Sequence, residues 1–264
     1  MSTVTTAPAI DPDALTAEIG GDSTAATWAK LSIQPVIVLL VLGGFAIWKS
    51  TASFDSIEAR QLAWGNILNR TVEHIQLSVA ATVVVLAVAI PLGVLLTRRG
   101  MRRAAPFFVG IANIGQAAPA VGLVILLVLL IALGFWTTVL ALFLFGLLPA
   151  LRNTIVGLQQ VDQRLVEAAR GMGMTGWATL FRVELPLAVP IILAGARTAL
   201  VLLVGTAAFG ALVDAGGLGG LIVTGIKLTR PSVLVSGGLL VASLALIIDW
   251  LGRVVEEVAR PKGV

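Results

Sequence analysis

The sequence has no cysteine, no tyrosine and a single histidine, His74. Without cysteine the chain can form neither disulfides nor thiolate-ligated metal sites. A zinc site needs three or four clustered ligands, and one histidine without a carboxylate cluster around it does not supply them. We therefore expect no metal site in this chain.

Charged residues are also scarce. They make up 12% of the chain, 58% of the residues are apolar, and the mean hydropathy is +1.00. A soluble domain has about 25% charged and 45–50% apolar residues, so the composition indicates a polytopic membrane protein. The net charge of +4 could suggest nucleic acid. However, the basic residues flank apolar runs, so we expect membrane lipid and no nucleic acid as a partner.

Sequence motifs of enzymes are missing too. The chain has no GxxxxGK[ST] loop to hold ATP phosphates, and neither GxSxG nor HExxH occurs. No paired carboxylates form an acid–base site. We therefore expect that the chain is not an enzyme and binds no cofactor itself.

The first residues differ in composition from the rest. Residues 1–29 contain no Lys or Arg and carry four acidic residues, which does not fit the basic start of a secretory signal peptide. Their Thr, Ala, Pro and Gly content predicts a flexible tail over residues 1–30. Asp11-Pro12 could start a short helix.

Uncharged gaps predict an all-α fold with about six transmembrane helices, in a domain over residues 31–252, because about 20 apolar residues cross a bilayer. The 48 uncharged residues of 104–151 are too long for one span, so we place a turn at 134–138. The predicted spans are 31–48, 75–97, two within 104–151, 185–212 and 232–248.

Basic residues predict the orientation. Twelve Lys and Arg residues lie in the linker 98–103, in the segment 152–182, in the C-terminal tail 253–264 and at Lys30, whereas five lie on the other side. The positive-inside rule places the twelve in the cytoplasm. Both termini are then cytoplasmic.

One span contains polar residues and prolines. Asn113, Gln116 and Pro119 lie in the first half of the 104–134 stretch. We favour a long Pro-kinked helix. The alternative is non-helical backbone at membrane depth, which must be buried in protein or line a wet cavity. These three residues could then face a translocation path.

Arg197 lies within a predicted span, where it should face protein or water. We expect it to bond carbonyls or a partner helix, with a gating role on a translocation path as the alternative. Asp249 could pair with Arg253 at i+4. The Gly-rich run from Gly216 to Gly220 predicts a turn followed by a partly inserted hairpin.

The longest charged segment between apolar ones spans residues 161–186. Val161, Leu165, Ala168 and Met172 recur at helical spacing and predict an amphipathic helix. Glycines at 171 and 173 weaken it. Thr175 can cap a second short helix, and Pro186 is well placed at the start of the next span. By itself, this pattern equally fits a helix lying on lipid headgroups.

This segment also resembles a known signature. Glu167-Ala168-Ala169, Gly173, Val183 and Leu185-Pro186 resemble, in type and spacing, the EAA motif of permease subunits of bacterial binding-protein-dependent ABC importers. Val183 stands where the usual motif has Ile. The stretches ELPLAVPIILAGARTA and AGGLGGLIVTGI resemble the glycine betaine, choline and carnitine branch. The resemblance covers roughly residues 70–252.

The resemblance implies a type I ABC importer permease-like fold in the bacterial inner (cytoplasmic) membrane, and import of a small osmolyte. It implies two ATPase subunits that bind ATP and Mg, a second permease subunit, identical or homologous, and a periplasmic or lipid-anchored substrate-binding protein. The helix with Glu167 would dock on the ATPase. Alternatives are a permease for an amino acid such as methionine, or an ion-coupled secondary transporter. The latter predicts inverted repeats and a mid-membrane carboxylate, and the sequence has neither.

Overall fold

The computed structural model describes residues 24–259, with side chains from residue 31 onward. The helix expected at Asp11-Pro12 and most of the tail 1–30 lie outside the described residues. Within this range every regular element is helical. In chain order the elements are α2 (Thr24–Thr51), α3 (Ser56–Gln61), α4 (Trp64–Thr97), the 3-10 turn η1 (Arg102–Ala104), α5 (Ala105–Ala117), α6 (Ala120–Leu130), α7 (Phe135–Gln159), α8 (Gln163–Gly171), α9 (Gly176–Thr179), the π-helical turn η2 (Leu180–Glu184), α10 (Leu185–Ala207), the 3-10 turn η3 (Ala208–Val213), α11 (Gly219–Lys227) and α12 (Pro231–Ala259).

Five helices in the described range are long and apolar enough to cross a membrane, and the bent pair α5–α6 makes up to six. This confirms the all-α fold with about six spans. Several boundaries differ from the prediction. α4 begins at Trp64 rather than at residue 75, and α12 continues as helix to Ala259, through part of the expected tail 253–264. The turn expected at 134–138 was placed too late: it lies between the end of α6 at Leu130 and Phe135, where α7 begins, and α7 continues beyond residue 151 to Gln159.

The expectation of one kinked helix over 104–134 was wrong. Two helices lie there, and they meet at an angle of 98° across a break at Ala118-Pro119. Ala118 is extended, with ψ of 142°, because the ring of the following proline disfavours helical backbone in the residue before it. Pro119 also has no N–H to continue the helical hydrogen bonds. Non-helical backbone therefore interrupts this span.

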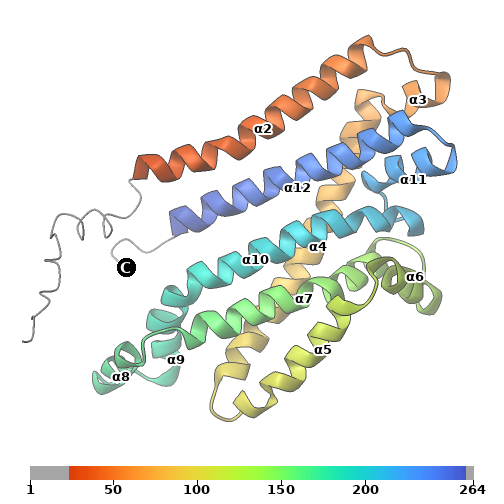
Figure 1. Cartoon of the computed structure of the whole chain (residues 1–264). Helices are drawn as coiled ribbons and strands as arrows, with labels where there is room; N and C mark the ends of the chain where they lie inside the picture. Colours follow the sequence, from red (N-terminus) through yellow and green to blue (C-terminus); the bar gives the residue numbers. More distant parts are fainter. Residues whose placement is uncertain (1–23, 260–264) are drawn as a thin grey trace, which may run out of the picture.

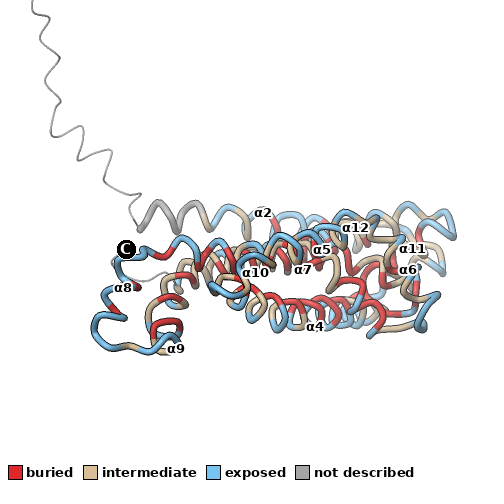
Figure 2. Tube along the Cα trace, turned by 90° about the horizontal axis from the view of Figure 1, so that it is seen from below, coloured by how far each residue is buried: buried red, intermediate tan, exposed pale blue. Residues whose placement is uncertain are grey.

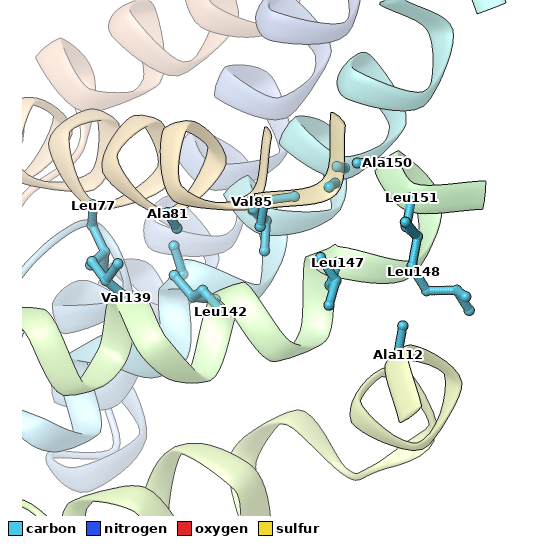
Figure 3. Close-up of a cluster of buried hydrophobic side chains, with 14 of the residues drawn as sticks. Leu77, Ala81, Val85, Ala112, Val139, Leu142, Leu147, Leu148, Ala150 and Leu151 are labelled. Atoms are coloured by element: carbon cyan, nitrogen blue, oxygen red, sulfur yellow. The ribbon is translucent and has the colours of Figure 1, made fainter. Parts of the chain in front are cut away.

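The core lies where α4, α7 and α10 meet. Figure 3 shows Leu77, Ala81 and Val85 of α4 facing Val139 and Leu142 of α7, and all five are buried. They recur every three or four residues, so each helix contributes one continuous apolar stripe. At the other end of the same cluster Ala112 of α5 lies against Leu148 and Leu151 of α7.

Small residues bring these three helices unusually close. A Cβ atom built on Gly93 of α4 would lie 2.6 Å from Cγ2 of Thr154 on α7. A Cβ on Gly195 of α10 would lie 2.4 Å from Cβ of Asn153 on the same helix α7. Side chains cannot occupy such distances, so glycine is required for helices in apolar surroundings to pack at this separation. α4, α7 and α10 thus form one tightly packed block.

The remaining helices surround this block, and the molecule has two distinct ends (Figure 1). α2 packs mainly on α12 and leaves Leu39 and Leu40 largely exposed. α8, α9, the α4–α5 linker and the end of α12 lie at one end, whereas α3, α6 and α11 lie at the other. The basic linker 98–103 and the basic segment 152–182 are therefore at the same end of the molecule.

Candidate functional site

The segment between α7 and α10 folds from local signals. The Asp162 side chain accepts a hydrogen bond of 2.8 Å from the backbone N–H of Arg164 and caps α8. Gly173 follows the helix with a φ of +85°, a backbone conformation that glycine adopts without strain. Thr175 then caps α9 by accepting from the N–H of Ala178. The expected helix, glycine break and Thr-capped second helix are confirmed.

The predicted apolar stripe of this helix is only partly right. Val161 is buried, but Leu165 and Met172 are 49% and 74% exposed. The buried face is formed instead by Val166 and Ala169, which are 4% and 2% exposed. The reason is that α8 begins only at Gln163, so Val161 does not lie on the helix and does not set its face. Val166 packs with Leu158, Leu180, Ala188 and Ile192.

The outer face of α8 is therefore an apolar surface without a partner among the described residues. Leu165, Ala168 and Met172 are spaced at i, i+3 and i+7, so they lie on one face, and all three are exposed. Glu167 is exposed beside them, while Ala169 points inward. Figure 2 shows α8 as mostly exposed at the tip of the molecule. We call the surface formed by Leu165, Ala168 and Met172 the outer face of α8, and Glu167 lies at its edge.

An ion pair ties the segment to the rest of the chain. Arg98, directly after α4, donates from both terminal nitrogens to the carboxylate of Glu184, at 3.2 and 2.5 Å. Glu184 is buried, with 6% exposure. A two-pronged arginine–carboxylate pair fixes orientation as well as distance. Sequence reasoning missed Glu184, although a lone acid between Val183 and Leu185-Pro186, with a basic cluster elsewhere, was a signal.

α10 continues directly from this ion pair. Leu180–Glu184 form a π-helical turn, a rare geometry that often occurs at functional sites. Val183 and Leu185 are half-buried, and Pro186 lies in the first turn of α10, as expected. The motif residues from Glu167 to Pro186 thus form one continuous structure running from the outer face of α8 to the start of α10.

The residues proposed for a translocation path do not form one cluster within a single subunit. Asn113 and Pro119 are exposed and Gln116 is half-buried, on α5 and at its break. α5 packs on α7, whereas Arg197 on α10 faces α12. Among the described residues no hydrogen bond joins Arg197 to Asn113 or Gln116. Their role in a path stays a prediction.

Arg197 instead binds a partner helix, one of the two roles expected for it. Its Nη1 lies 2.7 Å from Oδ1 of Asp249, and its Nε lies 2.7 Å from Oε1 of Glu256, both on α12. The expected pair of Asp249 with Arg253 is present at 3.0 Å. Gln34 of α2 donates to the same Asp249 at 3.1 Å. Sequence reasoning missed Gln34 and Glu256.

The Gly-rich run lies at the opposite end of the molecule from α8. Gly216 and Gly217 have φ of +81° and +87°, and the N–H of Gly217 donates to Glu73 at 2.8 Å. The turn is confirmed, and α11 follows it and packs on α12. In residues 24–259, no three His, Asp or Glu side chains gather closely enough to hold a metal ion.

Comparison with known proteins agrees with the family resemblance that the motif residues from Glu167 to Pro186 indicated. A family model described as "Binding-protein-dependent transport system inner membrane component" matches residues 89–260. The glycine betaine/carnitine/choline transport system permease protein OpuCB of Bacillus subtilis is 40% identical over 199 residues, which cover 75% of this chain and 91% of that protein. The carnitine transport permease protein OpuCD of Listeria monocytogenes is 41% identical over 189 residues, covering 71% and 84%. The osmoprotectant import permease protein OsmY of Salmonella typhimurium is 38% identical over 221 residues, covering 82% and 92%.

Solved structures share the fold. A crystal structure of the MetNI methionine ABC transporter in an inward-facing conformation superposes with a TM-score of 0.64 and 24% sequence identity. The match covers 74% of this chain and 96% of that one. At this identity the likeness concerns the helical architecture alone.

Proposed function

Because the chain belongs to the family of binding-protein-dependent transport system inner membrane components, we propose that it is the transmembrane subunit of an ATP-driven importer for a small osmolyte. Glycine betaine, choline and carnitine are the favoured solutes, since relatives at 38–41% identity are named for their transport or for osmoprotectant import. The methionine alternative is less well supported, because the methionine transporter shares 24% identity and shows the fold alone.

The main structural support for this proposal is the exposure of the apolar outer face of α8. An exposed apolar stripe beside Glu167 is a surface that another protein can bury. We assign it as the docking surface for an ATPase subunit, which binds the ATP and Mg. The segment then lies in the cytoplasm, in agreement with the basic residues at the same end. Both termini would be cytoplasmic.

Solute selection is assigned to a separate substrate-binding protein on the outer side. A quaternary ammonium is held best by an aromatic cage, and this chain has no Tyr and six Trp. Trp136 and Trp177 are each 72% exposed, Trp64 is 50% exposed, and all three lie near helix ends. A second permease subunit, identical or homologous, would complete the pore, with Asn113 and Gln116 as candidate lining residues.

Transport by the reconstituted complex tests the solute class. Uptake of labelled betaine, choline, carnitine and methionine is measured in proteoliposomes, with and without the binding protein. We expect uptake of at least one quaternary amine, only when the binding protein is present. Uptake of methionine alone would reject the solute class, and selective uptake without a binding protein would reject the division of roles.

Charge placement on α8 tests the docking surface. Met172→Glu on the outer face, or Glu167→Lys at its edge, should abolish substrate-stimulated ATP hydrolysis while the protein stays inserted. Gln163→Glu adds the same charge as Met172→Glu but on the opposite side of the helix, nine residues away, and serves as the matched control for that variant. Equal stimulation in all three variants would show that the ATPase does not dock on this face.

A further inference from the structure

We propose that one anionic phospholipid binds in a two-part cleft at the end of the molecule that carries α8, with its phosphate against arginines and an acyl chain in an adjoining apolar groove. The cleft lies between the α4–α5 linker, the end of α7 and the α8–α9 segment. The inference goes beyond the transport function and does not depend on which solute is carried.

The first part of the cleft is strongly basic. It has a volume of about 690 Å³, and Arg98, Arg99, Arg102 and Arg170 line it together with a single carboxylate, that of Glu184. Glu184 is already paired with Arg98. Within residues 24–259 no ion pair involves the other three arginines. Cations that line one cleft repel one another, and an anion bound between them offsets this repulsion, so the cleft is complementary to a phosphate group.

The second part is an apolar groove that continues from the first. It has a volume of about 660 Å³, and Arg98 and Arg170 line both parts. Its walls come from Ile90 and Val94 of α4 and from Trp177 and Phe181. These two aromatic rings stack with centroids 6.0 Å apart, and they are 72% and 61% exposed. Large aromatic side chains left open beside a groove are typical of a surface that another molecule covers.

The depth of the groove matches a lipid. From Ile90 to Arg98 the chain rises about 12 Å along α4, at 1.5 Å per residue. α4 is a spanning helix that ends at Thr97, so Arg98 lies at the level of the headgroups. The groove then lies within the nearer half of a hydrocarbon core about 30 Å thick. Basic pockets at this level between transmembrane helices suit anionic headgroups. A free phosphate ion would account for the basic part alone, so we commit to the lipid.

The lipid and a docked ATPase would not compete for α8. Gln163, Val166 and Arg170 face the cleft. The outer face, with Leu165, Ala168 and Met172, is displaced from them by two residues, which corresponds to about 200° around a helix of 3.6 residues per turn. The two surfaces are thus on nearly opposite sides of α8, and both can be occupied at once.

Native mass spectrometry of the purified full-length chain tests the site. The chain is titrated in detergent with phosphatidylglycerol, or with phosphatidylcholine of the same acyl chains. We expect one tightly retained phosphatidylglycerol per chain and no such phosphatidylcholine. The variant R99Q/R102Q/R170Q should weaken retention at least about tenfold, since each arginine near an anionic surface contributes measurably. Equal retention of both lipids would overturn the proposal.

A matched control variant also replaces three arginines at the α8 end of the molecule, but these arginines lie outside the cleft. R103Q/R164Q/R182Q should retain the lipid as the wild type does, and an equal loss in both triple variants would show diffuse attraction instead of a site. The groove is tested separately by W177S/F181S, which should weaken phosphatidylglycerol retention without changing the thermal unfolding midpoint.

Two further arms separate the possible sources of the anion. Inorganic phosphate and glycerol 1-phosphate, added at the concentration of the lipid, should leave phosphatidylglycerol bound. Displacement by either would identify a site for a free anion and refute the lipid. The titration is repeated on the assembled importer, where loss of the bound lipid on assembly would show that the cleft belongs to a protein partner.

Discussion

Gly173→Ala isolates the contribution of the turn after α8. Gly173 has a φ of +85°, and a Cβ atom built on it meets no heavy atom within 4 Å. Steric clash with the rest of the protein is therefore excluded, and only the backbone conformation opposes the change. For residues other than glycine, left-handed backbone costs about 1–2 kcal/mol. A cost of this size corresponds to a factor of about 5–30 in the population of the native turn.

Gly171→Ala is the matched control, two residues earlier in the chain. Gly171 also has open space around its Cβ position but ends α8 without a positive φ. Alanine is favoured over glycine in helices by up to about 1 kcal/mol, so this variant should be neutral or stabilised. The two substitutions add the same methyl group and differ only in the backbone that receives it.

Substrate-stimulated ATP hydrolysis by the whole importer in proteoliposomes is the measurement. We expect Gly173→Ala to reduce stimulation several-fold and Gly173→Asp to reduce it further, because a charge is added next to the docking surface. Gly171→Ala should keep wild-type stimulation. If Gly173→Ala also keeps it, the turn does not depend on its left-handed backbone, and the reasoning fails.

Three other perturbations test the remaining structure. A cysteine at Met101, unique in this cysteine-free chain, should resist an impermeant thiol reagent added outside intact cells, since the basic linker should be cytoplasmic; labelling from outside would refute the orientation. Glu184→Gln removes a buried charge from Arg98, which is itself one third exposed, and should destabilise the protein by about 1–3 kcal/mol in detergent denaturation; an unchanged midpoint would contradict this. Arg197→Met removes the arginine partner of Glu256 and one of the two arginines that bind Asp249, and it should cost about 2–3 kcal/mol. Arg253→Met, at a 52% exposed site, should cost less than about 1 kcal/mol; equal losses would argue against a central role for Arg197.

Signals that act over short stretches of sequence were enough for much of this fold. The span count, the capping by Thr175 and the position of Pro186 follow from length, local hydrogen bonding and proline chemistry. The i+4 pair of Asp249 and Arg253 is local as well. The segment 161–186 was located through its motif residues, and its arrangement of helix, turn and helix could be predicted from its caps and glycines.

Features decided by tertiary contacts could not be predicted in this way. The inward face of α8 depends on Leu180 and Ile192, which belong to elements further along the chain, and so Val166 was missed. Glu184 and Arg98 are 86 residues apart, and nothing local joins them. The break at Pro119 required a choice between two geometries that the residues alone leave open, because helix kinks and helix ends at proline have the same sequence signature.

The close glycine contacts among α4, α7 and α10 determine how a movement at one end of the molecule is transmitted to the other. α7 leads into the segment that carries α8, and α10 leads out of it. The two helices interlock at Asn153 and Gly195, and α7 interlocks with α4 at Thr154 and Gly93, without room to slide. If an ATPase subunit docks on α8 as proposed, a displacement of α8 should therefore move α4, α7 and α10 together as one rigid unit. A pathway would then open and close at the contacts between this three-helix block and the helices around it. A displacement at the α8 end would reach the opposite end of the block with little change in the packing between the two.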